Sequence, residues 1–110
     1  MRNYKLYLKD MFDAVIKIEK YTDGMSFQQF EKNDLVIDGV IRNLEVIGEA
    51  SKQISSELRK KMGAIEWKKI SGLRDILIHA YFGVDIQIIW DIVQNNIPIL
   101  KKSLHIYLKK

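Results

Sequence analysis

The stretch with the most chemically versatile residues is "GLRDILIHAYFG", residues 72–83. It places Arg74, Asp75, His79 and Tyr81 among apolar side chains. An unperturbed imidazole has a pKa of about 6.5, so a histidine can give or take a proton at neutral pH. Arginine stays charged, and its planar fork matches two oxygens of a phosphate or carboxylate group. These residue types would suit acid–base chemistry on an anionic group.

The spacing of apolar residues predicts that this stretch lies in a helix over about 66–82, which Gly83 would end. An ideal helix turns by about 100° per residue, which puts one apolar face toward the core. That predicted face consists of Ile70, Leu73, Leu77, Ala80 and Tyr81. Ile76 and Ile78 flank the polar face, so this helix is apolar nearly all round and is expected to be buried on a second side, such as a subunit interface.

Two relations between the polar residues follow from the same helical geometry. Asp75 and His79 stand four residues apart, so the carboxylate could hydrogen-bond the imidazole, fix its tautomer and raise its basicity. Arg74 and His79 diverge by about 140° around an ideal helix. Their cooperation would therefore need the arginine to reach round, a distorted last turn, or a symmetry-related copy of the pair.

Each of these residues also has an ordinary structural explanation. The helix dipole favours a histidine near a helix C-terminus, a helical arginine usually forms a salt bridge, and a tyrosine at a core margin packs there. The residue types alone favour these roles over catalysis. No cofactor is expected, and a metal site is disfavoured because one histidine and one aspartate supply too few ligands.

Length and composition bound the class of protein. A chain of 110 residues corresponds to one domain, 1–110, and can build a core without metal or disulfide support. The lack of cysteine excludes thiol chemistry and fits a reducing compartment. Residues 1–20 carry frequent charges, and no uncharged run of about 18 residues occurs, so we expect no signal peptide, no membrane partner and a cytoplasmic location. The net charge of +4 fits either solvated lysines at helix ends, the favoured interpretation, or an anionic partner such as nucleic acid.

The rest of the chain shows helical periodicity almost throughout. Helices are predicted over 2–21, over a short stretch after a Ser26–Gln29 capping box, and from Asn33 or Asp34 into the fifties, where Gly48 and Ser51 would allow a close helix crossing. Residues 55–67 are predicted to hold a helix end and a loop. Asp85 would cap the next helix, and Pro98 predicts a break near 95–96 before a last helix. The predicted fold is all-α, an up-and-down bundle of about five helices.

A second group of polar residues lies on the helix predicted from 34 into the fifties, and a second histidine lies near the C-terminus. Arg42, Glu45 and Glu49 align on the face of their helix opposite its core stripe, at spacings suited to salt bridges. A solvated face is the favoured interpretation, and a role in partner contact or in supporting the 72–83 helix is the alternative. Nothing in the sequence around His105 suggests chemistry, so we expect it to be a helix-end residue.

The run "GLRDILIHAYFGVD" resembles the signature of the HEPN superfamily, specifically its HepT branch: arginine, a polar residue, a spacer, histidine, one residue, then tyrosine. Arg74, Asp75, His79 and Tyr81 fit every position. The stretches "RNLEVIGEAS" (42–51), "WKKISGLRD" (67–75) and "VDIQIIWDIVQNNIPIL" (84–100) are also similar to HepT proteins, so the resemblance spans nearly the whole chain.

This resemblance implies an all-α homodimer whose motif helices face each other across a cleft. It also implies the toxin of a toxin–antitoxin pair, a metal-independent endoribonuclease acting on RNA. Its antitoxin partner would be a minimal nucleotidyltransferase that adds AMP to the motif tyrosine, here Tyr81. Arg74 and His79 would be catalytic, with Asp75 and Tyr81 in support. A non-catalytic scaffold for the nucleotidyltransferase and a nucleotide-binding helical domain remain the alternatives.

Overall fold

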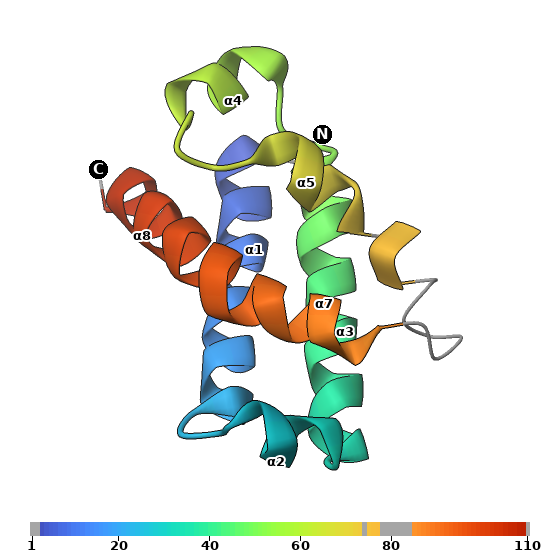
Figure 1. The fold of residues 1–110 in the computed structure, drawn as a ribbon. Coiled ribbons are helices and arrows are strands. Elements are labelled where there is room, and N and C mark those ends of the chain that lie inside the picture. The colour runs from blue at the N-terminus through green and yellow to red at the C-terminus, as the bar shows by residue number, and fades with distance from the viewer. Residues whose placement is uncertain (1–2, 74, 78–84, 110) are drawn as a thin grey trace.

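The predicted all-α fold is confirmed in the computed structural model, which describes residues 3–73, 75–77 and 85–109 (Figure 1). All regular structure in these residues is helical. The elements are α1 (Tyr4–Thr22), α2 (Phe27–Glu31), α3 (Asp34–Ser51), α4 (Ser56–Lys61), α5 (Trp67–Ser71), α7 (Ile86–Asp91), the π-helical turn η1 (Ile92–Asn96) and α8 (Ile97–Leu108). Within the described ranges, no helix combines the length and the apolar character needed to cross a membrane.

The centre of the fold is the antiparallel pair α1 and α3, which share the most extensive contact in the described chain (Figure 1). Their apolar stripes are buried largely as predicted, with Leu8 and Met11 of α1 against Leu44 and Ile47 of α3 in one core cluster. Tyr4 lies in the first turn of α1 and is exposed. Burial of these stripes removes apolar surface from water, which is the main force that holds the two helices together.

The helix starts follow the predicted capping chemistry. The Ser26 hydroxyl accepts the Gln29 N–H and the Gln29 side chain accepts the Ser26 N–H, which completes the capping box at α2. The Asn33 side chain accepts the Val36 N–H at α3, and the Asp85 side chain accepts the Gln87 N–H at α7. These side chains satisfy backbone N–H groups that have no partner within the helix.

The prediction of a loop over 55–67 was wrong in part. Residues Ser56–Lys61 form α4, whose start is capped by the Ser55 hydroxyl accepting the Leu58 N–H. Leu58 is buried, so even this polar segment contributes one side chain to the core. The helix ends at Lys61, two residues before Gly63, a residue type that is unfavourable in a helix interior.

The helix break predicted near Pro98 is not seen as a break in the structure. The chain stays helical from α7 into α8 but widens into η1, where the Ile97 N–H donates to the Ile92 carbonyl five residues earlier. Pro98 follows directly, in the first turn of α8. In a regular α-helix its ring would clash with the carbonyl four residues before it, and the wider turn relieves that clash.

The single helix predicted over 66–82 is also wrong, because α5 ends at Ser71 and Gly72 forms a turn. Gly72 has φ −83° and ψ 0°, and a Cβ atom there would lie only 3.3 Å from the Lys68 carbonyl oxygen. A side chain at this position would therefore require a small shift of the neighbouring backbone. Helical geometry resumes at Leu73 and at 75–77, so wheel angles cannot be carried from α5 across the turn.

Candidate functional site

Of the four residues predicted to form the site, Arg74, His79 and Tyr81 lie outside the described residues. Asp75 is described and exposed, as its predicted polar face requires. Its N–H donates to the Gly72 carbonyl oxygen at 3.1 Å, so its position depends directly on the turn. The hydrogen bond between Asp75 and His79 stays a prediction.

The segment that leads into the motif packs closely against α3. A Cβ atom added to Gly48 would lie 3.7 Å from both the Ile70 carbonyl oxygen and the Leu73 Cβ atom. The close helix crossing predicted at Gly48 is therefore confirmed. Ile70, Leu73 and Leu77 are buried, which confirms the described part of the predicted core face, and Ile76 is half-buried.

A polar cluster at the end of α3 anchors this crossing. We call it the Arg59 cluster; it consists of Ser51, Arg59, Trp67 and Ser71. Ser51 is fully buried, and its hydroxyl donates to the Gly48 carbonyl at 2.7 Å and lies 3.4 Å from the Ser71 hydroxyl. Arg59 donates from Nη2 to the Ser51 carbonyl at 2.7 Å and to the Ser71 hydroxyl at 3.4 Å.

Arg59 and Trp67 donate additional hydrogen bonds to backbone carbonyls at two helix ends, beside the backbone N–H groups that already reach the Ser51, Arg59 and Met62 carbonyls. Arg59 also donates from Nε to the Ile54 carbonyl at 3.2 Å, just beyond the end of α3. Trp67 donates from Nε1 to the Arg59 and Met62 carbonyls, both at 3.1 Å, at the end of α4. The guanidinium carbon lies 5.3 Å from the indole ring centroid, within the range of a cation–π contact. Together these contacts hold α3, α4 and α5 in one arrangement immediately before the motif.

Sequence reasoning missed the Arg59 cluster. Its members are up to 20 residues apart, as with Ser51 and Ser71, and neither a helical spacing nor a known motif joins them. Within the sequence, only the pair Gly48 and Ser51 on one side of a helix pointed to this region. That pair predicted the helix crossing but did not identify the residues whose hydrogen bonds hold it.

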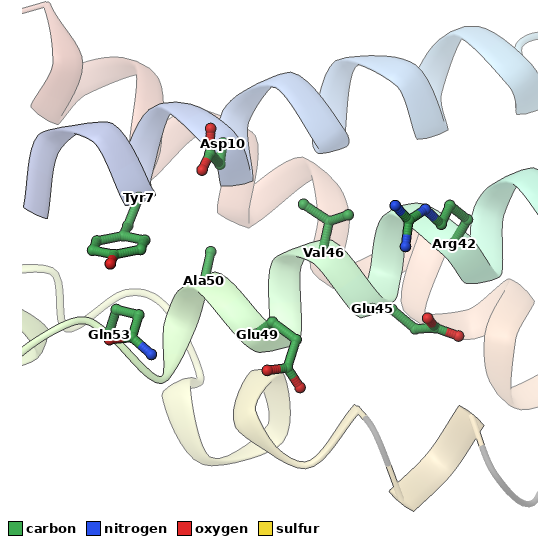
Figure 2. A pocket seen from close by; sticks show the side chains of 8 residues that line it. All are labelled: Tyr7, Asp10, Arg42, Glu45, Val46, Glu49, Ala50 and Gln53. Carbon is green, nitrogen blue, oxygen red and sulfur yellow. The ribbon is translucent and has the colours of Figure 1, made fainter. Parts of the chain in front are cut away.

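A pocket of about 460 Å³ lies between α1 and α3, on the face turned away from α8 (Figure 2). Arg42, Glu45 and Glu49 line it from α3, and all three are exposed. Glu49 pairs with Lys52 at 3.4 Å, a solvent-exposed contact of the kind that contributes little to stability. Glu49 therefore agrees with the favoured interpretation of a solvated face. Because the same face lines a pocket, contact with a partner remains the alternative.

The described parts of the chain contain no group of three or more His, Asp or Glu side chains close enough to hold a metal ion. Three acidic residues line the α1–α3 pocket, Asp10, Glu45 and Glu49, but they do not form such a group.

Comparison with known proteins identifies relatives over almost the entire chain. Residues 11–105 match the family model described as "Ribonuclease HepT-like". A protein of Thermococcus cleftensis named "Probable ribonuclease HepT" is 42% identical over 100 residues, 91% of this chain and 91% of its own. A protein of Methanocaldococcus jannaschii named "Putative RNase MJ1380" is 38% identical over 105 residues, 96% of each chain. No solved structure matches the chain.

The Arg59 cluster makes a prediction about stability. Replacement Arg59→Ala removes the hydrogen bonds from a charged donor to the Ile54 carbonyl, the Ser51 carbonyl and the Ser71 hydroxyl, so the free energy of unfolding should fall by about 2 kcal/mol. Urea denaturation at matched protein concentration measures this change. Lys60→Ala, an exposed residue next in the chain, is the control and should change stability by less than about 0.5 kcal/mol. Equal effects of the two replacements would show that the cluster does not hold the helices together.

Proposed function

The chain belongs to the HepT-like ribonuclease family, and we propose on that basis that it is a metal-independent endoribonuclease and acts as a homodimer. The observation that carries this proposal is the family match, which covers residues 11–105 and so includes the whole motif stretch 72–83. The named relatives of similar length support it.

The proposed reaction uses the 2′-hydroxyl of RNA as its own nucleophile. A base takes the proton from this hydroxyl, its oxygen attacks the adjacent phosphorus, and the 5′-oxygen leaves with a proton from an acid. The products are a 2′,3′-cyclic phosphate and a free 5′-hydroxyl. Such proton transfer by a positioned side chain contributes roughly 10²- to 10⁴-fold in rate.

In this proposal His79 moves the proton and Arg74 binds the phosphate. The fixed charge of an arginine and its planar fork suit both the ground state and the extra negative charge of the transition state. Asp75 orients His79, and Tyr81 contacts RNA beside the phosphate. The exposed position of Asp75 next to the Gly72 turn is compatible with these roles.

The dimer is proposed from the divergence of Arg74 and His79 by about 140° around an ideal helix. Two copies of the motif segment facing each other across a two-fold axis would supply an arginine from one chain and a histidine from the other. The half-buried Ile76 offers apolar surface beside the exposed Asp75, as expected for a segment that also packs against a second copy.

The biological role we propose is that of a toxin held in check by a nucleotidyltransferase antitoxin. Transfer of AMP from ATP to the Tyr81 hydroxyl would release pyrophosphate and leave a phosphodiester on the ring. The added anion and its bulk beside Arg74 would exclude RNA by steric conflict and by repulsion of like charges.

The first prediction concerns cleavage. Purified protein should cut RNA in the presence of EDTA and leave 2′,3′-cyclic phosphate ends, detected by mass spectrometry of the fragments. His79→Ala and Arg74→Ala should each lower the rate by about 100-fold or more, because each removes a catalytic group. Gln28→Ala, on the exposed side of α2, should cut as the wild type does. Cleavage that depends strictly on added Mg²⁺ would contradict the proposal, and a stable protein without any cleavage would favour the scaffold alternative.

The second prediction concerns the shared site. Arg74→Ala and His79→Ala subunits, each inactive alone, should regain activity when mixed through refolding. Half of the dimers are then mixed, and each mixed dimer has one intact site, which gives about a quarter of wild-type activity for a two-fold dimer. If mixed dimers form, as sedimentation of differently tagged chains can verify, and remain inactive, each site belongs to one chain.

The third prediction concerns modification. Incubation with the partner nucleotidyltransferase and ATP should add AMP to Tyr81, found by tandem mass spectrometry, and should abolish RNA cleavage. Tyr81→Phe should take up no AMP, since it has no hydroxyl. Tyr21→Phe, at a half-exposed tyrosine of α1, should still be modified. An adduct on another residue, or none, would refute this mode of control.

A further inference from the structure

A second pocket, of about 410 Å³, lies between the first half of α1 and the end of α8. Its volume is in the range of small-molecule sites. We call it the α1–α8 pocket. Leu6, Phe12 and Leu108 make its lining largely apolar, and the charged residues among its described lining are all lysines, namely Lys5, Lys9 and Lys109. This combination fits a ligand with a flat apolar part and negative charge beside it.

The aromatic part of the α1–α8 pocket comes from two rings. His105 of α8 stacks on Phe12 of α1 with ring centroids 6.1 Å apart and an angle of 28° between the planes. Phe12 is half-buried and His105 is exposed, so the helix packing supports the imidazole from one side and leaves it accessible. A supported, accessible ring of this kind is a platform on which a nucleobase can stack.

The lysines at the rim are available to an anion. Lys9 is paired with Asp13 at 3.2 Å, but both side chains are more than half exposed. Such a pair is weak in water and gives way to a phosphate at little cost. Lys5 and Lys109 are exposed near the N-terminal and C-terminal ends of the described chain.

We propose that the α1–α8 pocket binds one nucleotide of single-stranded RNA, with its base stacked on His105 and its flanking phosphates on the three lysines. The choice of RNA as ligand rests on the function proposed above. Residues 75–77 and the end of α8 lie on opposite sides of the molecule in Figure 1, so this contact is separate from the motif stretch. It would hold a long RNA and leave the chemical step unchanged.

The experiment measures binding of a fluorescein-labelled, fully 2′-O-methylated oligonucleotide to the full chain by fluorescence anisotropy at several salt concentrations. The oligonucleotide lacks the 2′-hydroxyl nucleophile and cannot be cleaved. Each phosphate contact to a single strand contributes about 0.7 to the slope of log K against log salt, so Lys5→Ala with Lys9→Ala should lower the slope by about 1.4. Lys17→Ala with Lys20→Ala, two exposed lysines elsewhere on α1, is the matched control and should leave the slope unchanged.

The stacking half of the proposal is tested at His105. His105→Ala should weaken binding by about ten-fold, the effect of losing one base–aromatic contact, and His105→Phe should restore it. All of these side chains are exposed, so circular dichroism should show an unchanged fold.

Equal salt slopes for the two lysine pairs, or unchanged affinity in His105→Ala, would overturn the proposal. Unchanged RNA affinity together with lost binding of the nucleotidyltransferase would make the pocket a protein-docking surface instead. Because the oligonucleotide cannot be cut, a wild-type protein that binds it through this pocket but cleaves no RNA would refute the proposed function alone.

Discussion

The close contact between α3 and α5 at Gly48 determines where the motif segment can lie. The carbonyl of Ile70 and the Cβ atom of Leu73 lie beside Gly48, where an added Cβ atom would be in van der Waals contact with both. The Arg59 cluster then fixes the angle of approach, because its bonds end on the backbone carbonyls of α3 and α4. A partly buried polar network of this kind favours one arrangement of the helices, because moving a helix would break several of its hydrogen bonds. The exposed Asp75 thus follows directly on a crossing that packing and hydrogen bonds hold together.

Much of the fold could be predicted from the sequence because its causes are local. Periodic apolar residues gave the core stripes of α1 and α3, and Ser26, Asn33 and Asp85 marked helix starts through side chains that bond within three residues. The exposed position of Asp75 and the burial of Leu73 and Leu77 followed from the same periodicity, even though the helix they were assigned to is interrupted.

The features that could not be predicted depend on residues far apart in the chain or on small differences in backbone energy. Trp67 caps the end of α4 only because the chain folds back at 62–66. Gly72 was placed inside one helix over 66–82, but the chain makes a turn there. The sequence around His105 suggested no role for it, because the ring it stacks on, Phe12, lies near the other end of the chain. Three of the four motif residues fall outside the described chain, so their mutual geometry stays a prediction.

The π-helical turn at Ile92–Asn96 is a place where a related chain could gain or lose one residue. A π turn holds one residue more than the α turn it replaces, so α7 and α8 can keep their mutual orientation although the chain between them is longer. Loss of one residue here would restore regular α-helix without turning Leu100 or Leu104 away from the core. Pro98 opposes that loss, because its ring would then meet a carbonyl in a regular turn. A related chain that lacks the extra residue is therefore expected to lack the proline as well.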